Sequence, residues 1–299
     1  MQADQTNSAV IAGAGTMGVS LAQIFAGAGL QVTLWNRSRA GLDRAAARLR
    51  ASRTAPEARI ALTTDETCFS SASFVLESIV EDLEQKQAFF RRVSGLVPAD
   101  CILATNTSGL SVTAMGKAVA VPARFCGMHW VNPPHLVPLV EVVQGGDTAP
   151  ETADAVHALA LRLGKRPIRV RDLPGFVMNR LQCALLREAL YLVESGSASV
   201  EDVDAAVKYG LGPRYACTGP FEAVDLGGVD VFCRIFGYLM ADLADGKGPD
   251  PLLQSLTDQG AWGVKSGRGF YDYSGGKAEA AVQERDRKFI QVLTALDEL

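Results

Sequence analysis

Short apolar runs alternate with amphipathic stretches along the first part of the chain. The runs SAVIAG, QVTLWN, SFVLESIV and CILATN are rich in β-branched and aromatic residues, so they predict strands. Between them, hydrophobic positions recur at helical spacing and predict helices over about 16–28, 40–52 and 84–94. Strands that alternate with helices form parallel sheets with helical crossovers. The pattern therefore predicts an α/β fold built on a doubly wound, mostly parallel sheet.

The pattern changes near residue 172, where strand-like runs give way to helical spacing. The stretch DLPGFVMNRLQCALLREALYLVESG predicts one long helix, with Asp172 and Pro174 near its start and Gly196 past its end. Further helices are predicted over about 200–209, 219–244 and 250–258, with a capping box at SVED and a charged helix at the C-terminus. We therefore expect two domains, a sheet domain of residues 1–171 and an all-helical domain of residues 172–299.

Composition and charge narrow the class of protein. Of the 299 residues 48% are hydrophobic and 21% are charged, which is enough to bury a sizeable core. A net charge of -4 argues against nucleic acid or an anionic membrane surface as the main partner. The polar start MQADQTNS and the lack of a long apolar run predict a cytoplasmic protein without a signal peptide or membrane span. Six cysteines without C-x-x-C spacing indicate reduced thiols.

A glycine motif follows the first predicted strand directly. In VIAGAGTMG, Gly13, Gly15 and Gly18 form G-x-G-x-x-G and open the next helix. The glycines allow a tight turn, close approach of a pyrophosphate and close helix–strand packing, while the helix N-terminus supplies free amides. The second predicted strand ends about 20 residues later at Asn36, which completes the context that the motif requires. The pattern predicts dinucleotide binding by a Rossmann-type domain.

The segment GMHWVNPPHLVPLVEVV sets a glutamate, Glu141, inside an apolar run. Residues 125–129 and 138–143 predict two strands joined by a proline-containing connection, which could bring His129 beside Glu141. A buried carboxylate needs a partner, and at one imidazole nitrogen it leaves the other nitrogen to exchange a proton with a substrate. On composition alone, a satisfied core histidine or a strand with one face in solvent is the more common arrangement.

These motifs together resemble a known family. In order along the chain, GAGTMG, ATNTSGLS, GMHWVNPPHLVPLVEVV, DLPGFVMNRL, GPFEAVDLGGVDV and KSGRGFYDY are similar to stretches of the L-3-hydroxyacyl-CoA dehydrogenases. That family includes the 3-hydroxybutyryl-CoA dehydrogenases, and lambda-crystallin and the L-gulonate and carnitine dehydrogenases are related to it. The resemblance implies that His129 is the general acid/base, with Glu141 as its orienting partner. It further implies that Ser108 and Asn179 hydrogen-bond the reacting substrate.

A larger set of residues is expected around the cofactor. The glycine motif, the end of the second strand and the resemblance assign to it Gly13, Gly15, Thr16, Met17, Gly18, Asn36, Arg37, Glu81, Lys86, Asn106, Ser108, Asn132 and Lys265. No metal ligand is assigned. Taken singly, Ser108 and Asn106 could instead cap a turn, Asn179 a helix, and Lys265 could be a solvated loop lysine.

The constellation suits hydride transfer between a nicotinamide and the 3-hydroxy or 3-oxo carbon of an acyl substrate, with His129 moving the hydroxyl proton. One departure from the family concerns the carrier. Many members have a long helical hairpin after the second strand that helps to hold CoA, whereas this chain has only RAGLDRAAARLRASRTAPEARIALTTD. A CoA thioester, a carrier-bound acyl group and a small free hydroxy acid therefore all stay open. So do a lysine-dependent β-hydroxyacid or imine reductase and a non-catalytic, crystallin-like protein that binds the cofactor.

A second departure concerns the cofactor. Members that use NAD usually have aspartate where this chain has Asn36, and a carboxylate there would repel a 2′-phosphate. Arg37 could pair with that phosphate. We expect use of both NAD(H) and NADP(H), with a lean to NADP(H). The expected partners are a small acyl substrate and a second copy, bound through the helical domain.

Overall fold

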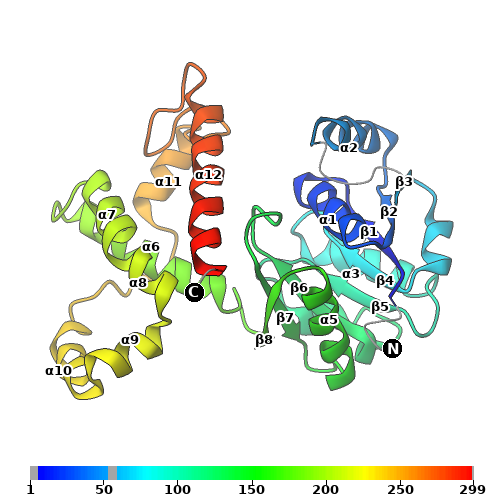
Figure 1. Cartoon of the computed structure of the whole chain (residues 1–299), viewed down its shortest axis with the longest axis horizontal. Coiled ribbons are helices and arrows are strands. Elements are labelled where there is room, and N and C mark those ends of the chain that lie inside the picture. The colour runs from blue at the N-terminus through cyan, green and yellow to red at the C-terminus, as the bar shows by residue number, and fades with distance from the viewer. Residues whose placement is uncertain (1–5, 53–58, 298–299) are drawn as a thin grey trace. The chain divides into compact units, whose positions relative to one another are not determined.

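The computed structural model describes residues 6–52 and 59–297 (Figure 1). The chain divides into two compact units, Met1–Arg180 and Leu181–Leu299. The division falls within helix α6 (Met178–Glu194), whose first residues belong to the first unit. Within the described residues, no helix combines the length and the apolar character that crossing a membrane requires.

The first unit is built on one sheet of eight strands, in the order β3-β2-β1-β4-β5-β6-β7-β8 over the described residues. Every neighbouring pair is parallel except β6–β7, so the predicted doubly wound, mostly parallel Rossmann-type sheet is confirmed. The order reverses at β1, which lies between β2 and β4. The strands are β1 (Ser8–Ala12), β2 (Gln31–Trp35), β3 (Ile60–Thr63), β4 (Phe74–Glu77), β5 (Ile102–Thr105), β6 (Phe125–Trp130), β7 (Leu139–Gln144) and β8 (Arg166–Arg171).

The helices of the first unit connect these strands. The predicted helices at about 16–28, 40–52 and 84–94 correspond to α1 (Thr16–Gly27), α2 (Arg39–Ser52) and α3 (Leu83–Val93). The sequence pattern did not predict α4 (Val112–Gly116), α5 (Pro150–Arg162) or the 3₁₀ turns η3 (Glu66–Ser71) and η4 (Pro122–Arg124). Strands β3 and β8 were not predicted either. In β8, RPIRVR places arginines among its apolar residues and hides the strand pattern.

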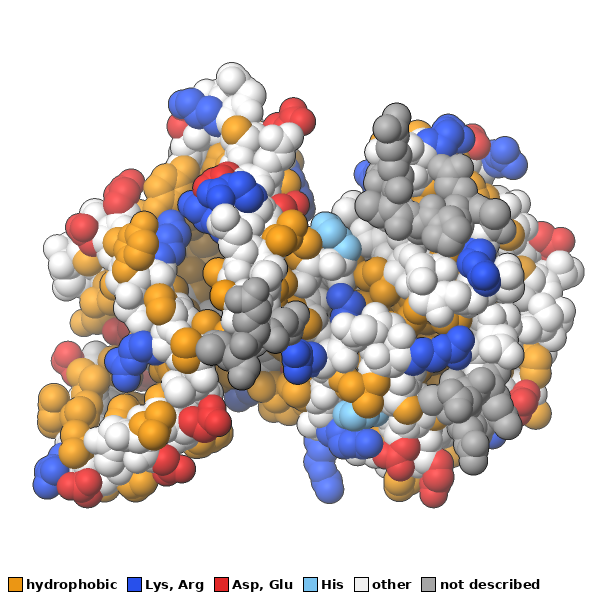
Figure 2. All heavy atoms as spheres, viewed as in Figure 1, with side chains coloured by type: hydrophobic (Ala, Val, Ile, Leu, Met, Phe, Trp, Pro, Cys, Tyr) orange, Lys and Arg blue, Asp and Glu red, His pale blue; other side chains and the backbone are white. Residues whose placement is uncertain are grey.

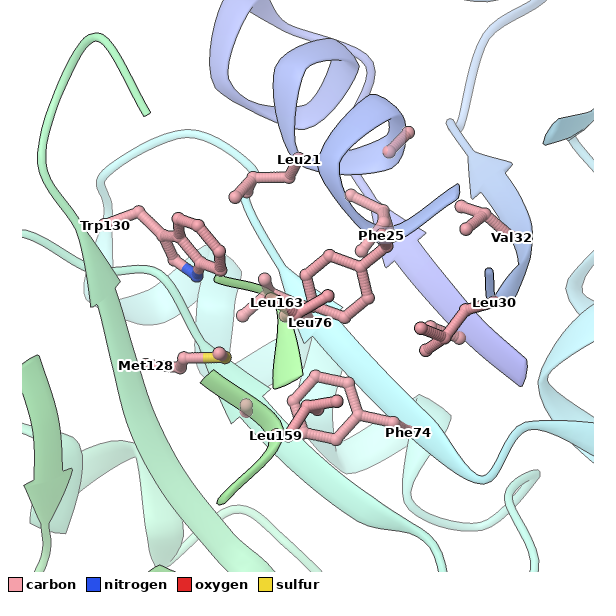
Figure 3. Packing of buried hydrophobic residues seen from close by; sticks show 14 of the residues in the cluster. Leu21, Phe25, Leu30, Val32, Phe74, Leu76, Met128, Trp130, Leu159 and Leu163 are labelled. Carbon is pink, nitrogen blue, oxygen red and sulfur yellow. The ribbon is translucent and has the colours of Figure 1, made fainter. Parts of the chain in front are cut away.

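Two hydrophobic clusters hold the helices against the sheet. One contains residues of α1 and α5, and its aromatic side chains converge where Phe25 lies 6.0 Å from Phe74 and 6.1 Å from Trp130 between ring centroids (Figure 3). The other contains residues of α3 and α4, where Phe90 packs edge-on against Phe125 at 4.7 Å. The two clusters fix the strand ends, and the loops that follow them, in a rigid frame.

The second unit is helical, as predicted. Beyond α6 its helices are α7 (Val200–Ala206), a π-helical turn η5 (Val207–Leu211), α8 (Gly212–Cys217), α9 (Pro220–Gly227), α10 (Val229–Leu239), α11 (Pro251–Asp258) and α12 (Lys277–Asp297). Ser199 caps α7 by accepting from the Asp202 N–H at 3.1 Å. Asp202 accepts from the Ser199 hydroxyl, so the return bond of a capping box is not made.

Two predicted helices in this region were wrong in extent. The long helix begins at Met178 and not near Asp172, because Gly175 (φ 76°) and Phe176 (φ 52°) adopt left-handed backbone that a helix cannot include. The predicted helix over 219–244 is broken at Gly228, whose φ of 94° separates α9 from α10, and it ends at Leu239. Asp172, which directly follows β8, instead caps α4 by accepting from the Val112 and Thr113 amides at 3.1 and 2.8 Å.

Candidate active site

The glycine turn between β1 and α1 has the shape of a phosphate cradle. A Cβ on Gly13, whose φ is 118°, would lie 2.4 Å from the Ser78 carbonyl oxygen, and one on Gly18 would lie 1.7 Å from the Gly13 carbonyl oxygen. A Cβ on Gly15 would meet no atom within 4 Å. Two glycines therefore allow close packing, and Gly15 leaves open space at the N-terminus of α1. Free helix amides facing such space fit a dinucleotide pyrophosphate.

A pocket of about 590 Å³ opens beside this turn. Its lining includes the predicted residues Gly13, Gly15, Asn36 and Arg37, together with Arg92 of α3. The Asn36 amide donates to the carbonyl and hydroxyl oxygens of Ser38 at 3.0 and 3.2 Å, so it is turned toward the start of α2. Arg37 is exposed. Thr16, Met17 and Gly18 form the first turn of α1 next to the pocket.

Arg92 was not predicted as a pocket residue. Its guanidinium donates to both carboxylate oxygens of Glu66 at 2.9 and 3.1 Å and lies 6.0 Å from the centre of the Phe89 ring. The sequence placed Arg92 in the last turn of a helix, where a basic residue is usual for electrostatic reasons. Nothing in that pattern indicated that this turn borders the glycine motif.

His129 and Glu141 stand opposite each other on the antiparallel strands β6 and β7. The distance from His129 Nδ1 to Glu141 Oε2 is 2.7 Å, and the two residues are 5% and 0% exposed. The strand does not turn its glutamate to solvent. Because one imidazole nitrogen is engaged by the carboxylate, Nε2 is the nitrogen left for a substrate.

The start of α6 holds the other oxygen of Glu141. Oε1 accepts from the backbone amides of Val177 and Met178 at 2.9 and 3.0 Å. Burial raises the pKa of Glu141, but the hydrogen bonds from His129, Met178 and Val177 outweigh it and bring the pKa below the ordinary value. Glu141 is therefore an ionised acceptor, and Nδ1 of His129 donates to it. The ring of Phe176 covers the imidazole at 5.5 Å between centroids.

Ser108 and Asn179 meet in the first unit. The Asn179 side-chain NH2 group has two N–H donors, and it donates to the Ser108 carbonyl oxygen at 2.6 Å. The Ser108 side chain is exposed. Asn106, two residues earlier, donates to the Ser78 hydroxyl at 3.3 Å and accepts from the Trp130 amide at 2.9 Å. Asn106 thus ties together the ends of β4, β5 and β6, close to His129.

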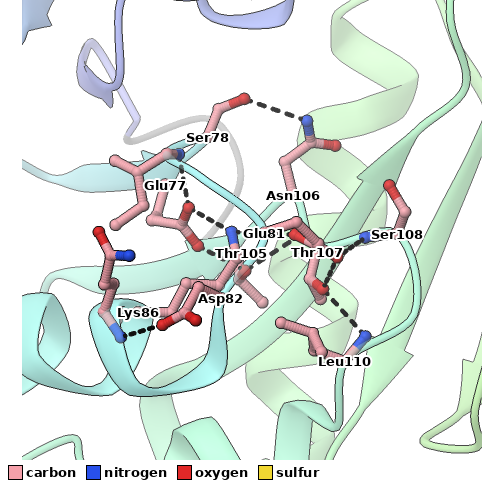
Figure 4. A network of polar contacts seen from close by, with 12 residues as sticks. Glu77, Ser78, Glu81, Asp82, Lys86, Thr105, Asn106, Thr107, Ser108 and Leu110 are labelled. Carbon is pink, nitrogen blue, oxygen red and sulfur yellow. Dashed lines mark hydrogen bonds and ion pairs between the residues drawn. The ribbon is translucent and has the colours of Figure 1, made fainter. Parts of the chain in front are cut away.

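A network of charges lies under the loop that carries Ser108 (Figure 4). Lys86 is buried and donates to Glu77 at 2.6 Å, and it lies 3.3 Å from Glu81. Glu81 accepts from the Thr107 hydroxyl at 2.5 Å and from the Ser108 amide at 2.8 Å. Lys86, which was expected to line the cofactor site, is 1% exposed, and its ammonium group contacts Glu77 and Glu81. Its role at the cofactor stays a prediction.

Two family models of known proteins match this chain. The family model described as "3-hydroxyacyl-CoA dehydrogenase, NAD binding domain" matches residues 8–173, and "3-hydroxyacyl-CoA dehydrogenase, C-terminal domain" matches residues 175–273. The chain belongs to the 3-hydroxyacyl-CoA dehydrogenase family. It is therefore an oxidoreductase that uses a nicotinamide cofactor, as the resemblance predicted.

Relatives in this family differ in substrate. A 5-formyl-3-hydroxy-2-methylpyridine 4-carboxylate 5-dehydrogenase of Mesorhizobium japonicum is 36% identical, over 97% of this chain and 98% of its own. A probable 3-hydroxybutyryl-CoA dehydrogenase of Deinococcus radiodurans is 38% identical, over 88% of this chain and 99% of its own.

Solved structures show the same two kinds of relative. An NAD+-dependent dismutase, a 5-formyl-3-hydroxy-2-methylpyridine 4-carboxylic acid 5-dehydrogenase, matches with a TM-score of 0.93 and 35% identity over 98% of this chain and 99% of its own. A (S)-3-hydroxybutyryl-CoA dehydrogenase of Ralstonia eutropha matches with a TM-score of 0.74 and 32% identity over 91% of this chain and all of its own.

Two expected site residues of this dehydrogenase take no part in the contacts described above. Asn132 is exposed in the connection between β6 and β7, just after Trp130. Lys265 is exposed in the second unit, after α11, so the first unit does not contain it. Their expected roles at the cofactor stay predictions.

Proposed function

We propose that this chain is a dehydrogenase that oxidises a hydroxyl group, or reduces the matching carbonyl, on a small substrate that is not carried by CoA. The observation that carries the chemistry is the buried pair of His129 and Glu141, whose free imidazole nitrogen can move a proton. A crystallin-like protein that only binds the cofactor has no use for such a pair.

The residues of the first unit divide the reaction between them. Nε2 of His129 takes the proton of the substrate hydroxyl, and ionised Glu141 stabilises the imidazolium that forms. The Ser108 hydroxyl and the amide of Asn179 support the substrate oxygen as it gains negative charge. A nicotinamide bound along the glycine turn supplies the hydride acceptor, or the donor in the reverse direction. In reduction, protonated His129 returns the proton.

The region after β2 favours a carrier-free substrate over an acyl-CoA thioester. Helix α2 ends at Ser52 and β3 begins at Ile60, so the segment between them is too short for the second arm of a helical hairpin. The pyridine carboxylate dehydrogenase relative also acts on a compound without CoA and matches nearly the whole chain. The thioester expected from the family resemblance is the competing substrate.

The same dyad would serve a hydrated aldehyde, which is the second candidate substrate because one similar structure is a dismutase. A hydrate carries a hydroxyl on the carbon that loses hydride. His129 would take the proton of this hydroxyl while the carbon gives a hydride to the oxidised cofactor, and a carboxylic acid would form. A second aldehyde would then take the hydride and a proton to form an alcohol.

A substrate panel tests these proposals. Acetoacetyl-CoA, acetoacetate, 3-hydroxybutyrate and 5-formyl-3-hydroxy-2-methylpyridine 4-carboxylate should be assayed with each nicotinamide at 340 nm, with products separated by chromatography. We expect turnover of a carrier-free compound with kcat/KM at least about tenfold above that of acetoacetyl-CoA. A clear preference for acetoacetyl-CoA would overturn the carrier-free proposal.

We propose that both NAD(H) and NADP(H) bind, with a lean to NADP(H). Asn36 places no carboxylate at the end of β2, and its amide is occupied with Ser38. The exposed guanidinium of Arg37 lines the pocket and can pair with a 2′-phosphate.

We also propose that two copies associate through the second unit, in the cytoplasm. Among the described residues of this unit, Leu190 and Ala261 are the buried hydrophobic residues. Tyr209, Phe221 and Leu226 are 83%, 86% and 79% exposed, and Figure 2 shows apolar side chains across the surface of the unit. Apolar surface of this extent is typical of an interface. Phe221→Asp should reduce the mass measured by light scattering from two copies to one, and an unchanged mass would contradict this surface.

A further inference from the structure

Glu77 is a buried carboxylate that the proposed proton transfer does not use. It ends β4 with 0% of its surface exposed and accepts from the Ile79 amide at 2.7 Å and from the Thr105 hydroxyl at 2.7 Å. Its third donor is the ammonium group of Lys86 at 2.6 Å, which is equally buried. Both oxygens of Glu77 are therefore satisfied, and its charge is compensated inside the protein.

The contacts continue from Lys86 toward the active-site loop. Lys86 lies 3.3 Å from Oε2 of Glu81, whose side chain is 43% exposed. Oε1 of Glu81 accepts from Thr107 and from the Ser108 amide. Burial raises the pKa of Glu81, but Thr107, Lys86 and the Ser108 amide outweigh it and lower the pKa, so Glu81 is an anion that attracts these donors. Figure 4 shows the series running from the strand ends to the loop.

A buried ion pair is a poor source of stability, because desolvation of both charges offsets most of their attraction. Its directional contacts are well suited to fixing a position. Glu77 holds one side of the Lys86 ammonium group within the core, so Lys86 presents its remaining donors toward Glu81. Glu81 in turn has one oxygen for Lys86 and the other for the loop.

We propose that Glu77 is a positioning residue that acts through Lys86 and Glu81 to fix the loop of Ser108. The effect of Glu77 on the loop does not depend on the proposed function, whereas its expected effect on turnover rests on that function. Glu77→Gln keeps the shape of the side chain but removes one charge, and it leaves Lys86 with Glu81 as its single carboxylate partner among those described. Lys86 is then no longer fixed by Glu77, so its contact with Glu81 loosens, and the hold of Glu81 on Thr107 and Ser108 loosens with it.

Hydrogen exchange of the cofactor-free protein tests the loop directly. In Glu77→Gln, amides of residues 106–110 should exchange about tenfold faster than in the wild type. Asp172→Asn is the matched control, since Asp172 also accepts three hydrogen bonds, from Ser111, Val112 and Thr113. That variant should loosen residues 111–116 and leave 106–110 protected. Unchanged exchange over 106–110 in Glu77→Gln would overturn the proposal.

A charge-balanced variant separates positioning from packing. Glu77→Gln combined with Lys86→Met leaves no uncompensated charge in the core, so its melting temperature should stay close to that of the wild type. Its loop should still exchange fast, and kcat should stay about tenfold or more below the wild-type value. If this variant restored both loop protection and kcat, Glu77 would be a packing residue only.

The two proposals can fail separately. If the wild type showed no dehydrogenase activity while Glu77→Gln still gave fast loop exchange, the positioning role would be supported and the proposed function contradicted. If Glu77→Gln does not fold, loop exchange in the variant that combines Glu77→Gln with Lys86→Met is the deciding measurement.

Discussion

The side-chain amide of Asn179, at the start of α6, donates a 2.6 Å hydrogen bond to the main-chain carbonyl of Ser108, in the loop between β5 and α4. The two residues are 71 positions apart in the chain. The same short stretch at the start of α6 also supplies the amides of Val177 and Met178 that hold Glu141. One helix start thus orients the acid–base pair and holds the loop of Ser108.

Removing the Asn179 amide should affect turnover more than cofactor binding. Asn179→Ala loses both the bond to Ser108 and a donor for the substrate oxygen, so kcat should fall by about 10- to 100-fold. The dissociation constant of the cofactor, measured by fluorescence, should change less than about threefold, because the glycine turn is untouched. Arg180→Ala, which removes a 3.4 Å contact to the Pro174 carbonyl, is the neighbouring control and should keep most of the turnover. Equal losses in both variants would contradict the role of Asn179.

The carboxylate of Glu141 should make the free energy of unfolding depend on pH in the acidic range. Its native pKa lies below the ordinary value of 4.5, so the unfolded chain binds this proton more readily than the folded one. The stability that Glu141 contributes is present above pH 4.5 and is lost as pH falls through the lower native pKa. Urea unfolding of the wild type and Glu141→Gln should therefore differ most near pH 5.5 and progressively less toward pH 3. A difference that stays constant over this range would contradict the assigned charge state.

Much of the sheet could be predicted, because parallel buried strands and amphipathic helices leave strong periodic patterns in the sequence. The opposition of His129 and Glu141 was predictable too, since both lie on neighbouring strands joined by a short connection. Glu77 was missed although it also sits in an apolar strand. Its partner Lys86 lies on a helix, and the pairing depends on how that helix packs against the sheet.

Backbone conformation explains the largest error. The start of α6 was placed too early because Asp172 and Pro174 are common at helix starts. Sequence did not reveal that Phe176 adopts a positive φ, which turns the chain so that the next amides reach Glu141. Such a conformation is rare for a bulky residue, and here it lies directly beside the proposed catalytic pair.

A carboxylate at the end of β2 should change cofactor preference. Asn36→Asp places a negative charge where a 2′-phosphate would bind, so kcat/KM for NADPH should fall about tenfold or more while that for NADH is kept. Arg37→Gln should also lower NADPH use selectively, because it removes the cation proposed to pair with the phosphate. A wild type that is already strictly dependent on NADH would contradict the proposed lean.

The nucleotide part of CoA should contribute little to binding. The segment between the end of α2 at Ser52 and the start of β3 at Ile60 is too short for a second helical arm that would hold it. Any thioester turnover should therefore be similar for acetoacetyl-CoA and its N-acetylcysteamine analogue, with kcat/KM values within about tenfold. A loss of several orders of magnitude with the shorter thioester would reveal a CoA site elsewhere on the protein.

The central claim is that His129 moves the proton during hydride transfer, and single-turnover kinetics test it most directly. His129→Gln keeps a side-chain amide that can donate to Glu141 but cannot exchange a proton at neutral pH. With the best substrate of the panel and saturating cofactor, the rate of nicotinamide absorbance change should fall by about 10²- to 10⁴-fold, while cofactor affinity stays near the wild-type value. A single-turnover rate close to that of the wild type would contradict the account.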